Sequence, residues 1–283
     1  MRLHLGLTLP SFRSDPGPVL AVARAAEAAG IDGVFAFDHL FRERGDGGVR
    51  AGDEPAIRPS LELLTTMGAV AAETSRVVVG SLVARASLRP PASLVAAFDT
   101  LARIAPGRLV AGIGAGDELS APEDEAFGVV PADRLACLTE AVGRARGRGY
   151  PVWVGGPSPA VRRLAAARAD GWNLWGGNAA RFAALAASVL EGVTAAGRDP
   201  AAFALTWGGL VLAGASDAEA KAKLERFGER PGLLWGGPER LAEELSAYTE
   251  AGAGWVVLGP IDSSNPDNAA VLGEAVRPLL AGS

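Results

Sequence analysis

Two kinds of apolar pattern alternate along the whole chain. Short apolar runs bounded by Gly, Asp or Ser are typical of buried β-strands, whereas longer Ala- and Leu-rich segments with helical spacing are typical of amphipathic helices. The predicted strands are Leu3–Leu9, Gly33–Phe37, Val77–Val83, Leu109–Gly112, Val152–Val154, Gly171–Leu174, Phe203–Leu212 and Gly254–Leu258. The predicted helices include Val19–Ala29, Ser60–Glu73, Ala92–Ile104, Ala160–Ala169, Ala180–Ala196 and Glu239–Ala251.

Eight strands with helices between them in 283 residues predict an α/β fold of the TIM barrel type, a (β/α)8 barrel. Glu27–Val34 and Glu250–Val256 share one pattern, in which a helix ends at a Gly and a buried strand follows. No linker or change in composition divides the chain, so we expect a single domain over residues 1–283. A doubly wound sheet is the alternative, but it usually has five or six strands.

Composition narrows the classes of protein and partner. Hydrophobic residues make up 49% of the chain and charged residues 21%, which is enough for a large core. A net charge of −5 argues against nucleic acid or an anionic membrane as a partner. No window approaches 18 uninterrupted apolar residues, so no membrane span is expected. The single cysteine, Cys137, cannot form an internal disulfide, and we expect a cytoplasmic protein.

The first candidate site follows the second predicted strand, where Phe37 leads into Asp38 and His39. Catalytic side chains of a barrel of this type lie at the C-terminal ends of its strands. A carboxylate there can orient an imidazole or a cofactor ring, and the imidazole can exchange a proton near neutral pH. The structural alternative is that Asp38 caps a turn and His39 packs beneath the loop. The long polar stretch His39–Pro59 is expected to form a lid or a pocket wall.

The second candidate site is the glycine-rich end of the fourth strand, Gly112–Glu118. Glycines allow the backbone to approach a flat or phosphorylated ligand, and either Asp117 or Glu118 is a candidate proton donor. The spacing is not that of a dinucleotide-binding fingerprint. The alternative is a flexible turn that carries two solvated acids.

Two glycine pairs, Gly155–Gly156 and Gly176–Gly177, precede predicted helix starts. The N–H groups at a helix start bind phosphate, although tight turns need glycine anyway. Two such pairs on consecutive units favour a phosphate-bearing cofactor. Ser81 interrupts the third strand, which indicates either a bulge near a ligand or a simple strand end.

Several common catalytic patterns are missing from the sequence. It contains no G-x-S-x-G nucleophile elbow, no H-E-x-x-H, no Walker loop and no Cys/His cluster for zinc. With only two histidines, a histidine-rich metal site is not expected, and no metal ligands are assigned; a carboxylate site stays open.

The order and spacing of several motifs identify a family resemblance. The matching segments are Ala26–Val34, Asp38–His39, Thr74–Ser81, Pro90–Leu101, Pro106–Gly116, Val152–Pro157 and Ala169–Trp172. Together they resemble the luciferase-like flavin and deazaflavin oxidoreductases, and especially the branch that depends on coenzyme F420. The resemblance covers nearly the whole chain.

This resemblance implies a (β/α)8 barrel that binds F420, or alternatively FMN, and acts on a small-molecule substrate as a homodimer. It places Asp38 beside the cofactor ring and His39 beside the substrate. Ser81 falls where the family has a β-bulge, often with a non-prolyl cis peptide. The other implied contacts are to cofactor at Ala115 and Gly116, to phosphate at Gly155 and Gly156, and an acid at Asp117.

The chain also departs from the family pattern. Glu43 stands where the sugar-phosphate dehydrogenase members have a Trp, so a sugar phosphate is not the expected substrate. The insertion before the fifth strand is shortened, because Glu140–Pro151 leads almost directly across. An F420-dependent oxidoreductase is the leading hypothesis. The alternatives are an FMN-dependent monooxygenase and a barrel that binds flavin or F420 without catalysis.

Overall fold

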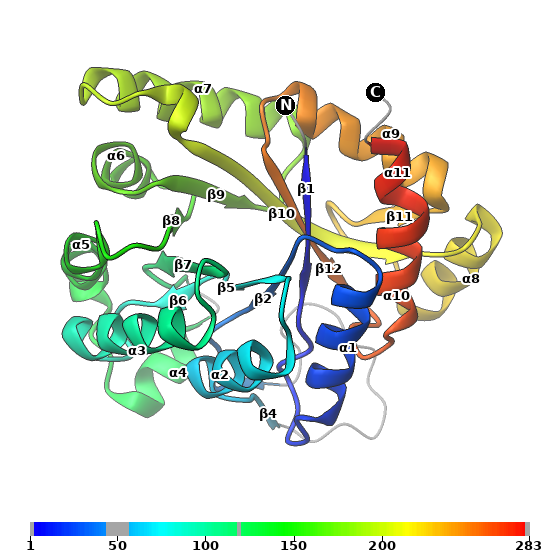
Figure 1. Ribbon diagram of the computed structural model, residues 1–283, viewed down its shortest axis with the longest axis horizontal. Helices are drawn as coiled ribbons and strands as arrows, with labels where there is room; N and C mark the ends of the chain where they lie inside the picture. The colour runs from blue at the N-terminus through cyan, green and yellow to red at the C-terminus, as the bar shows by residue number, and fades with distance from the viewer. Residues whose placement is uncertain (1–2, 44–56, 118–119, 281–283) are drawn as a thin grey trace.

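The computed structural model describes residues 3–43, 57–117 and 120–280. Eight parallel strands form a closed barrel, and most of the helices surround it (Figure 1). The barrel strands are β1 (His4–Thr8), β2 (Gly33–Ala36), β5 (Val78–Ser81), β7 (Leu109–Gly114), β8 (Val152–Gly155), β9 (Gly171–Trp175), β10 (Ala204–Ala213) and β12 (Trp255–Pro260). Pairing of β9 with β10, β10 with β12 and β12 with β1 closes the ring.

The predicted eight-stranded barrel is confirmed, as is the short connection before the fifth barrel strand. Only residues 146–151 separate the end of α5 from the start of β8. The helices outside the barrel are α1 (Gly17–Ala28), α2 (Leu63–Glu73), α3 (Pro91–Ile104), α5 (Arg134–Ala145), α6 (Pro159–Arg168), α7 (Ala179–Ala195), α8 (Asp217–Phe227) and α9 (Pro238–Glu250). The described part of the chain closes with α10 (Asp267–Ala270), the π-helical turn η4 (Val271–Val276) and α11 (Arg277–Leu280).

The sequence patterns did not predict every element. Ala220 is the one buried residue of α8, so this helix lacks the apolar stripe by which helices are recognised. The short strand β11 (Leu234–Gly236), which extends the sheet beside β10, was also not predicted. The stretch His39–Pro59, expected to form a lid or a pocket wall, contains the antiparallel pair β3 (Phe41–Glu43) and β4 (Ile57–Pro59). The helix α4 (Ala121–Phe127), which follows the glycine-rich end of the fourth strand, was also not predicted.

Aromatic side chains fill the barrel interior where glycines leave room for them. A Cβ built at Gly80 would lie 2.4 Å from the Phe35 ring, and one at Gly6 would lie 2.7 Å from it. Phe35 packs with Trp153 and Trp255, whose ring centroids lie 5.7 and 5.8 Å away. The interior is therefore a packed core, and any ligand site must lie at an open end.

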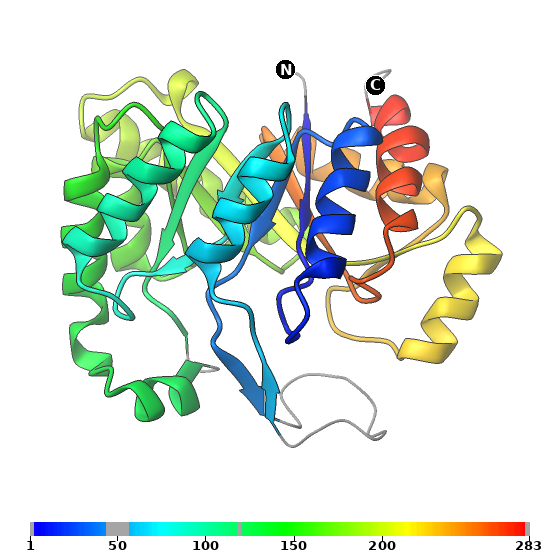
Figure 2. The ribbon, with the colours of Figure 1, turned by 60° about the horizontal axis from the view of Figure 1, so that its bottom comes forward.

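The additional elements lie beyond one end of the barrel. Figure 2 shows the β3–β4 ribbon and α4 projecting past the same end, which is where the C-terminal ends of the strands lie. No helix among the described residues is long and apolar enough to cross a membrane.

Near the opposite end, Glu27 of α1 connects to the segment that enters β5. Its carboxylate accepts hydrogen bonds from the backbone N–H groups of Ser75, Arg76 and Val77 at 2.6–3.2 Å. Burial opposes the charge, but these hydrogen bonds outweigh it and lower the pKa of Glu27 to about 2.

We expect Glu27→Gln to lower the free energy of unfolding at neutral pH by on the order of 1–2 kcal/mol, because charge-assisted hydrogen bonds are lost. A carboxyl with a depressed pKa stabilises the fold above its unfolded pKa and loses that effect as pH falls toward the folded value. The difference from wild type, measured by urea denaturation, should therefore shrink between about pH 4.5 and pH 2. Glu73→Gln, which removes an exposed pair with Arg24, is the control. An unchanged difference at pH 3 would contradict this assignment.

Candidate active site

The predicted site residues lie at the C-terminal ends of five successive barrel strands. Asp38 and His39 follow β2, Ser81 ends β5, and Ala115, Gly116 and Asp117 follow β7. Gly155 and Gly156 lie at the end of β8, and Gly176 and Gly177 follow β9. Glu118 lies outside the described residues. The parallel sheet therefore gathers these separate segments at one mouth of the barrel.

Asp38 is enclosed by protein and fully hydrogen-bonded. Its Oδ2 accepts from the backbone N–H of Arg85 at 2.9 Å and from Nη1 of Arg89 at 2.6 Å, and its Oδ1 accepts from Nη2 of Arg89 at 3.0 Å. Arg89 also pairs with Glu62 at 2.5 Å. Burial disfavours the charged guanidinium, but these two carboxylates outweigh that effect and raise the pKa of Arg89. Asp38 thus holds the turn after β5, and its contact with a cofactor stays a prediction.

His39 is held by a carboxylate that comes from α4. The imidazole Nδ1 lies 3.1 Å from Oε2 of Glu123, a residue whose side chain is 2% exposed. Burial would raise the pKa of Glu123, but hydrogen bonds from His39 and from the backbone of Phe41 and Leu40 hold it below its usual value. Glu123 is therefore an anion at neutral pH and an acceptor for the Nδ1 proton.

The His39 side chain is 28% exposed and belongs to an aromatic group on the rim of the mouth. Its ring centroid lies 5.6 Å from that of Phe12 and 5.7 Å from that of Phe37. Within the described part of the chain, Nε2 of the imidazole has no hydrogen-bond partner. This nitrogen is available to a ligand.

Arg85 of β6 (Ala84–Arg85) connects Asp38 with the two acidic residues of α4, Glu123 and Asp124. Its backbone N–H binds Asp38, while its Nη1 binds Oε2 of Glu123 and its Nη2 lies 3.6 Å from Asp124. Arg134 of α5 pairs with the other oxygen of Asp124. Because these charges are nearly all buried, each depends on its partner to offset the cost of desolvation.

The segment after β7 covers this ionic group. Gly116 has a φ of +79°, and a Cβ built there would lie 3.5 Å from Cδ of Arg85. Asp117 is exposed and accepts a hydrogen bond from the Ser120 hydroxyl at 3.2 Å. Ala115 packs against the core. The proposed acid Asp117 is thus accessible at the mouth, whereas its role as a donor stays a prediction.

Glycines at the mouth leave room for two larger side chains, those of Val83 and Trp175. Ser81 is buried and donates to the carbonyl of Gly112 at 2.7 Å, and the Leu82–Val83 peptide that follows is cis. A Cβ at Gly114 or Gly155 would lie within 2.8 Å of the Val83 side chain. Gly155 therefore has a packing reason to be glycine, separate from any phosphate.

On the other side, Trp175 at the end of β9 lies over glycines in the same way. A Cβ at Gly208 would lie 2.5 Å from its ring, and one at Gly259 would lie 3.1 Å from it. Trp175 is nevertheless 46% exposed, which is unusual for such a large apolar side chain. Val83 and Trp175 are thus both partly exposed at this end of the barrel, and these two side chains are called the floor of the mouth below.

Each of the two glycine turns has one backbone N–H that is already bonded within the protein. The N–H of Gly156 donates to the carbonyl of Asn173 and that of Gly176 donates to Gly208, so neither is free. Gly176 and Gly177 have φ of +74° and +78°, and Asn178 then caps α7. The Arg181 side chain comes within 3.0 Å of a Cβ built at Gly177, which places a cation beside this turn.

Sequence reasoning missed Arg85, Arg89, Glu123 and Trp175. Ser120 and Glu123 have the spacing of a capping box, which favours a local role at the start of a helix. In the structure the Ser120 side chain makes no cap hydrogen bond and Glu123 points inward. An arginine within an apolar run, as at Arg85, was the available signal, because a buried guanidinium requires carboxylate partners.

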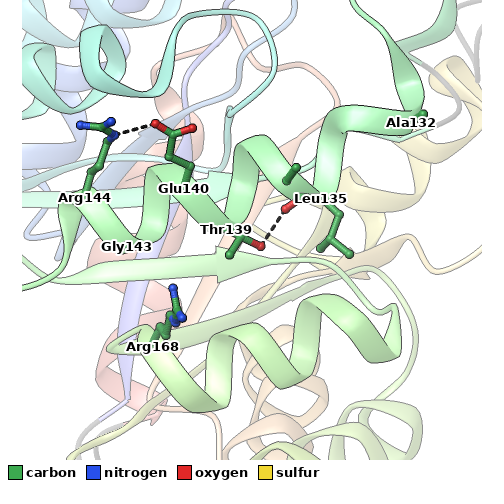
Figure 3. Close-up of a pocket in the computed structure, with 8 residues that line it drawn as sticks. Ala132, Leu135, Thr139, Glu140, Gly143, Arg144 and Arg168 are labelled. Atoms are coloured by element: carbon green, nitrogen blue, oxygen red, sulfur yellow. Dashed lines mark hydrogen bonds and ion pairs between the residues drawn. The ribbon is translucent and has the colours of Figure 1, made fainter.

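A separate groove lies on the surface of α5 (Figure 3). It is lined by Ala132, Leu135, Ala136, Thr139, Glu140, Gly143, Arg144 and by Arg168 of α6. None of the predicted site residues lines it. Among the described residues, no group of three or more His, Cys, Asp or Glu side chains could hold a metal ion.

The fold and the site define a TIM barrel with a candidate active site at the C-terminal ends of its strands. The family of luciferase-like monooxygenases matches residues 4–147 and 143–231, and the chain belongs to this family.

A protein of Nakamurella multipartita named F420-dependent glucose-6-phosphate dehydrogenase is 32% identical over 225 residues, which cover 69% of this chain. The match spans 63% of that relative, less than two thirds of its length. Among solved structures, an F420-dependent secondary alcohol dehydrogenase with an F420–acetone adduct has a TM-score of 0.79 at 19% identity and 99% coverage of both chains. A riboflavin lyase with modified FMN has a TM-score of 0.78 at 14% identity, covering 100% of this chain and 92% of its own. These two structures establish the shared fold.

We expect Asp38→Asn to lower the free energy of unfolding by roughly 3 kcal/mol, because it removes a buried carboxylate that pairs with Arg89 and leaves Glu62 as the remaining charge partner of that guanidinium. Urea denaturation measures this loss. Asp133→Asn, an exposed position without a side-chain cap hydrogen bond, should change stability by less than about 0.5 kcal/mol. Unchanged stability of Asp38→Asn together with weaker cofactor binding would instead identify Asp38 as a ligand-contacting group.

Proposed function

We propose that this protein is an F420-dependent oxidoreductase that transfers a hydride between the deazaflavin and a small organic substrate. The observation that carries the proposal is the mouth of the barrel. There, Nε2 of His39 has no partner among the described residues, and Val83 and Trp175 are packed on glycines at the same end of the barrel. The name of the N. multipartita relative supports F420 as the cofactor. When bound, coenzyme F420 supplies the hydride chemistry, and the protein supplies orientation and a proton.

The floor suits a planar cofactor. Its two side chains are packed down on the glycines of β7, β8, β10 and β12, so that no side chain from these four positions rises above them. Any larger residue at Gly114, Gly155, Gly208 or Gly259 would displace Val83 or Trp175. A flat ring system would therefore rest on apolar side chains, with His39 on the rim.

The start of α7 suits the phosphate of such a cofactor. Free N–H groups of the first helical turn carry partial positive charge, and the Arg181 side chain lies next to Gly177. Gly177 itself provides the left-handed turn that brings the chain into this helix. We assign Gly176, Gly177 and Arg181 to the phosphate end of the cofactor. Ala115, Gly116, Gly155 and Gly156 stay predicted cofactor contacts.

His39 is the residue that exchanges a proton with the substrate. With Nδ1 held by Glu123, its Nε2 can accept or donate a proton at the mouth without a change in the position of the ring. Asp117 is the second candidate, since it is exposed after the end of β7, which is separated from β2 by β5. The aromatic rings of Phe12 and Phe37 exclude water from one side of the imidazole.

The cofactor assignment is tested by titrating the purified protein with F420 and, separately, with FMN, and following the fluorescence of each. We expect saturable quenching with F420 and none, or far weaker binding, with FMN. Gly177→Glu places a carboxylate beside the phosphate end and should weaken F420 binding at least tenfold, whereas Gly197→Glu at a remote turn should not. Preference for FMN would overturn the proposal in favour of oxygen chemistry.

A His39→Gln variant separates binding from turnover in the same experiment. It should bind F420 as wild type does and should lower kcat by about 10²- to 10⁴-fold with a substrate found by screening, because proton transfer is lost. Unchanged kcat would remove His39 from the chemistry. Glucose 6-phosphate and a secondary alcohol belong in that screen, since relatives and structural neighbours are named for them.

We further propose that the protein is a cytoplasmic homodimer. The single cysteine suits a reducing compartment, and the exposed apolar side chains of Phe127, Val130 and Leu135 offer contact area on α4, on α5 and on the segment between them. Sedimentation velocity of the purified protein should give twice the mass of the 283-residue chain, and Leu135→Lys should shift the boundary toward the monomer. A monomer at all concentrations would contradict the homodimer.

A further inference from the structure

We propose that Glu123 is the positioning residue for His39: it fixes the imidazole as the Nδ1–H tautomer and presents an unprotonated Nε2 to the substrate. This inference rests on the proposed role of His39 at the mouth and adds a residue to that site. The sequence suggests no such role, because the spacing of Ser120 and Glu123 is that of a helix cap.

The two carboxylate oxygens of Glu123 serve different partners. Oε1 accepts from the backbone N–H groups of Leu40 at 2.5 Å and of Phe41 at 3.1 Å. Oε2 faces the imidazole Nδ1 at 3.1 Å and the Arg85 guanidinium. The carboxylate therefore binds both the side chain of His39 and the two backbone N–H groups that follow it, so the ring cannot turn without breaking its hydrogen bond to Glu123.

The donor and acceptor roles follow from charge. An ionised carboxylate can only accept hydrogen bonds, and the Arg85 guanidinium can only donate them. The shared Oε2 therefore requires a proton on Nδ1 of His39. In a neutral imidazole, a proton on Nδ1 leaves the Nε2 lone pair free, and Nε2 is the nitrogen without a partner among the described residues.

Arg85 makes this arrangement rigid. Its side chain is 4% exposed, and it binds Glu123 through Nη1 while its backbone N–H binds Asp38, the residue before His39. Both sides of His39 are thus tied to one arginine. A charge network of this kind holds a catalytic imidazole within a narrow range of orientations, which is what proton transfer to a bound substrate needs.

The test is ¹⁵N NMR of histidine-labelled protein without cofactor, which reports directly which ring nitrogen carries the proton. The chain has only His4 and His39, and a His4→Gln variant assigns the signals. At a pH about two units above the ordinary imidazole pKa of about 6.5, we expect the Nδ1–H tautomer for His39. An Nε2–H tautomer in the wild-type protein would overturn the proposal, whatever any variant does.

Glu123→Gln provides the second measurement. The backbone N–H groups of Leu40 and Phe41 cannot move, so the amide oxygen should take the place of Oε1 and the NH2 group should donate to Nδ1. The Arg85 guanidinium then loses its acceptor at Oε2 and keeps Asp124 as its carboxylate partner. We therefore expect the tautomer to reverse to Nε2–H, and kcat to fall at least roughly tenfold but less than in His39→Gln. Affinity for F420 should stay within about twofold of wild type.

Glu125→Gln is the matched control, because Glu125 lies on the same helix and is exposed. It should leave both the tautomer and kcat unchanged. Retention of Nδ1–H and of full kcat in folded Glu123→Gln would overturn the positioning role. Because the NMR experiment needs no cofactor, its result stands apart from that of the F420 titration. A protein that fails to bind F420 but shows the expected tautomers would refute the proposed function alone.

Discussion

The site depends on the charge of one buried arginine. Arg85 lies at the mouth of the barrel, where desolvation of a guanidinium costs several kcal/mol unless carboxylates surround it. Meeting that requirement brings Glu123 and Asp124 inward from α4, while the backbone N–H of Arg85 binds Asp38 after β2. Three segments that are distant in the sequence are thereby fixed relative to one another. The geometry of His39 is a consequence of this network as much as of its own strand.

The barrel supplies the frame on which this network is built. Phe35, Trp153 and Trp255 fill its interior, and glycines on the neighbouring strands make room for them, so the centre of the barrel has no space for a ligand. At the mouth the same combination of glycine and large side chain recurs, but Val83 and Trp175 remain partly exposed. The same kind of packing therefore fills the interior of the barrel and leaves two partly exposed apolar side chains at its end.

Membership of the luciferase-like family and the arrangement of the mouth both support the candidate active site at this end of the barrel. The family match covers most of the barrel, and two elements outside the eight barrel strands, the β3–β4 pair and α4, both border His39. Glu123 reaches the imidazole from one of them.

The sequence by itself determined the eight strands, their order and the strand ends at which Asp38, His39, Ser81 and the glycine pairs stand. It could do so because periodicity and helix-ending glycines are local features, and a closed parallel barrel places the ends of all its strands on one side. Only the tertiary structure decided which partners these residues have. Asp38 meets two arginines from the third barrel unit, and His39 meets Glu123, which is 84 residues away. Such long-range ion pairs leave no periodic signal, since a buried charge can find its partner on any neighbouring element of the fold.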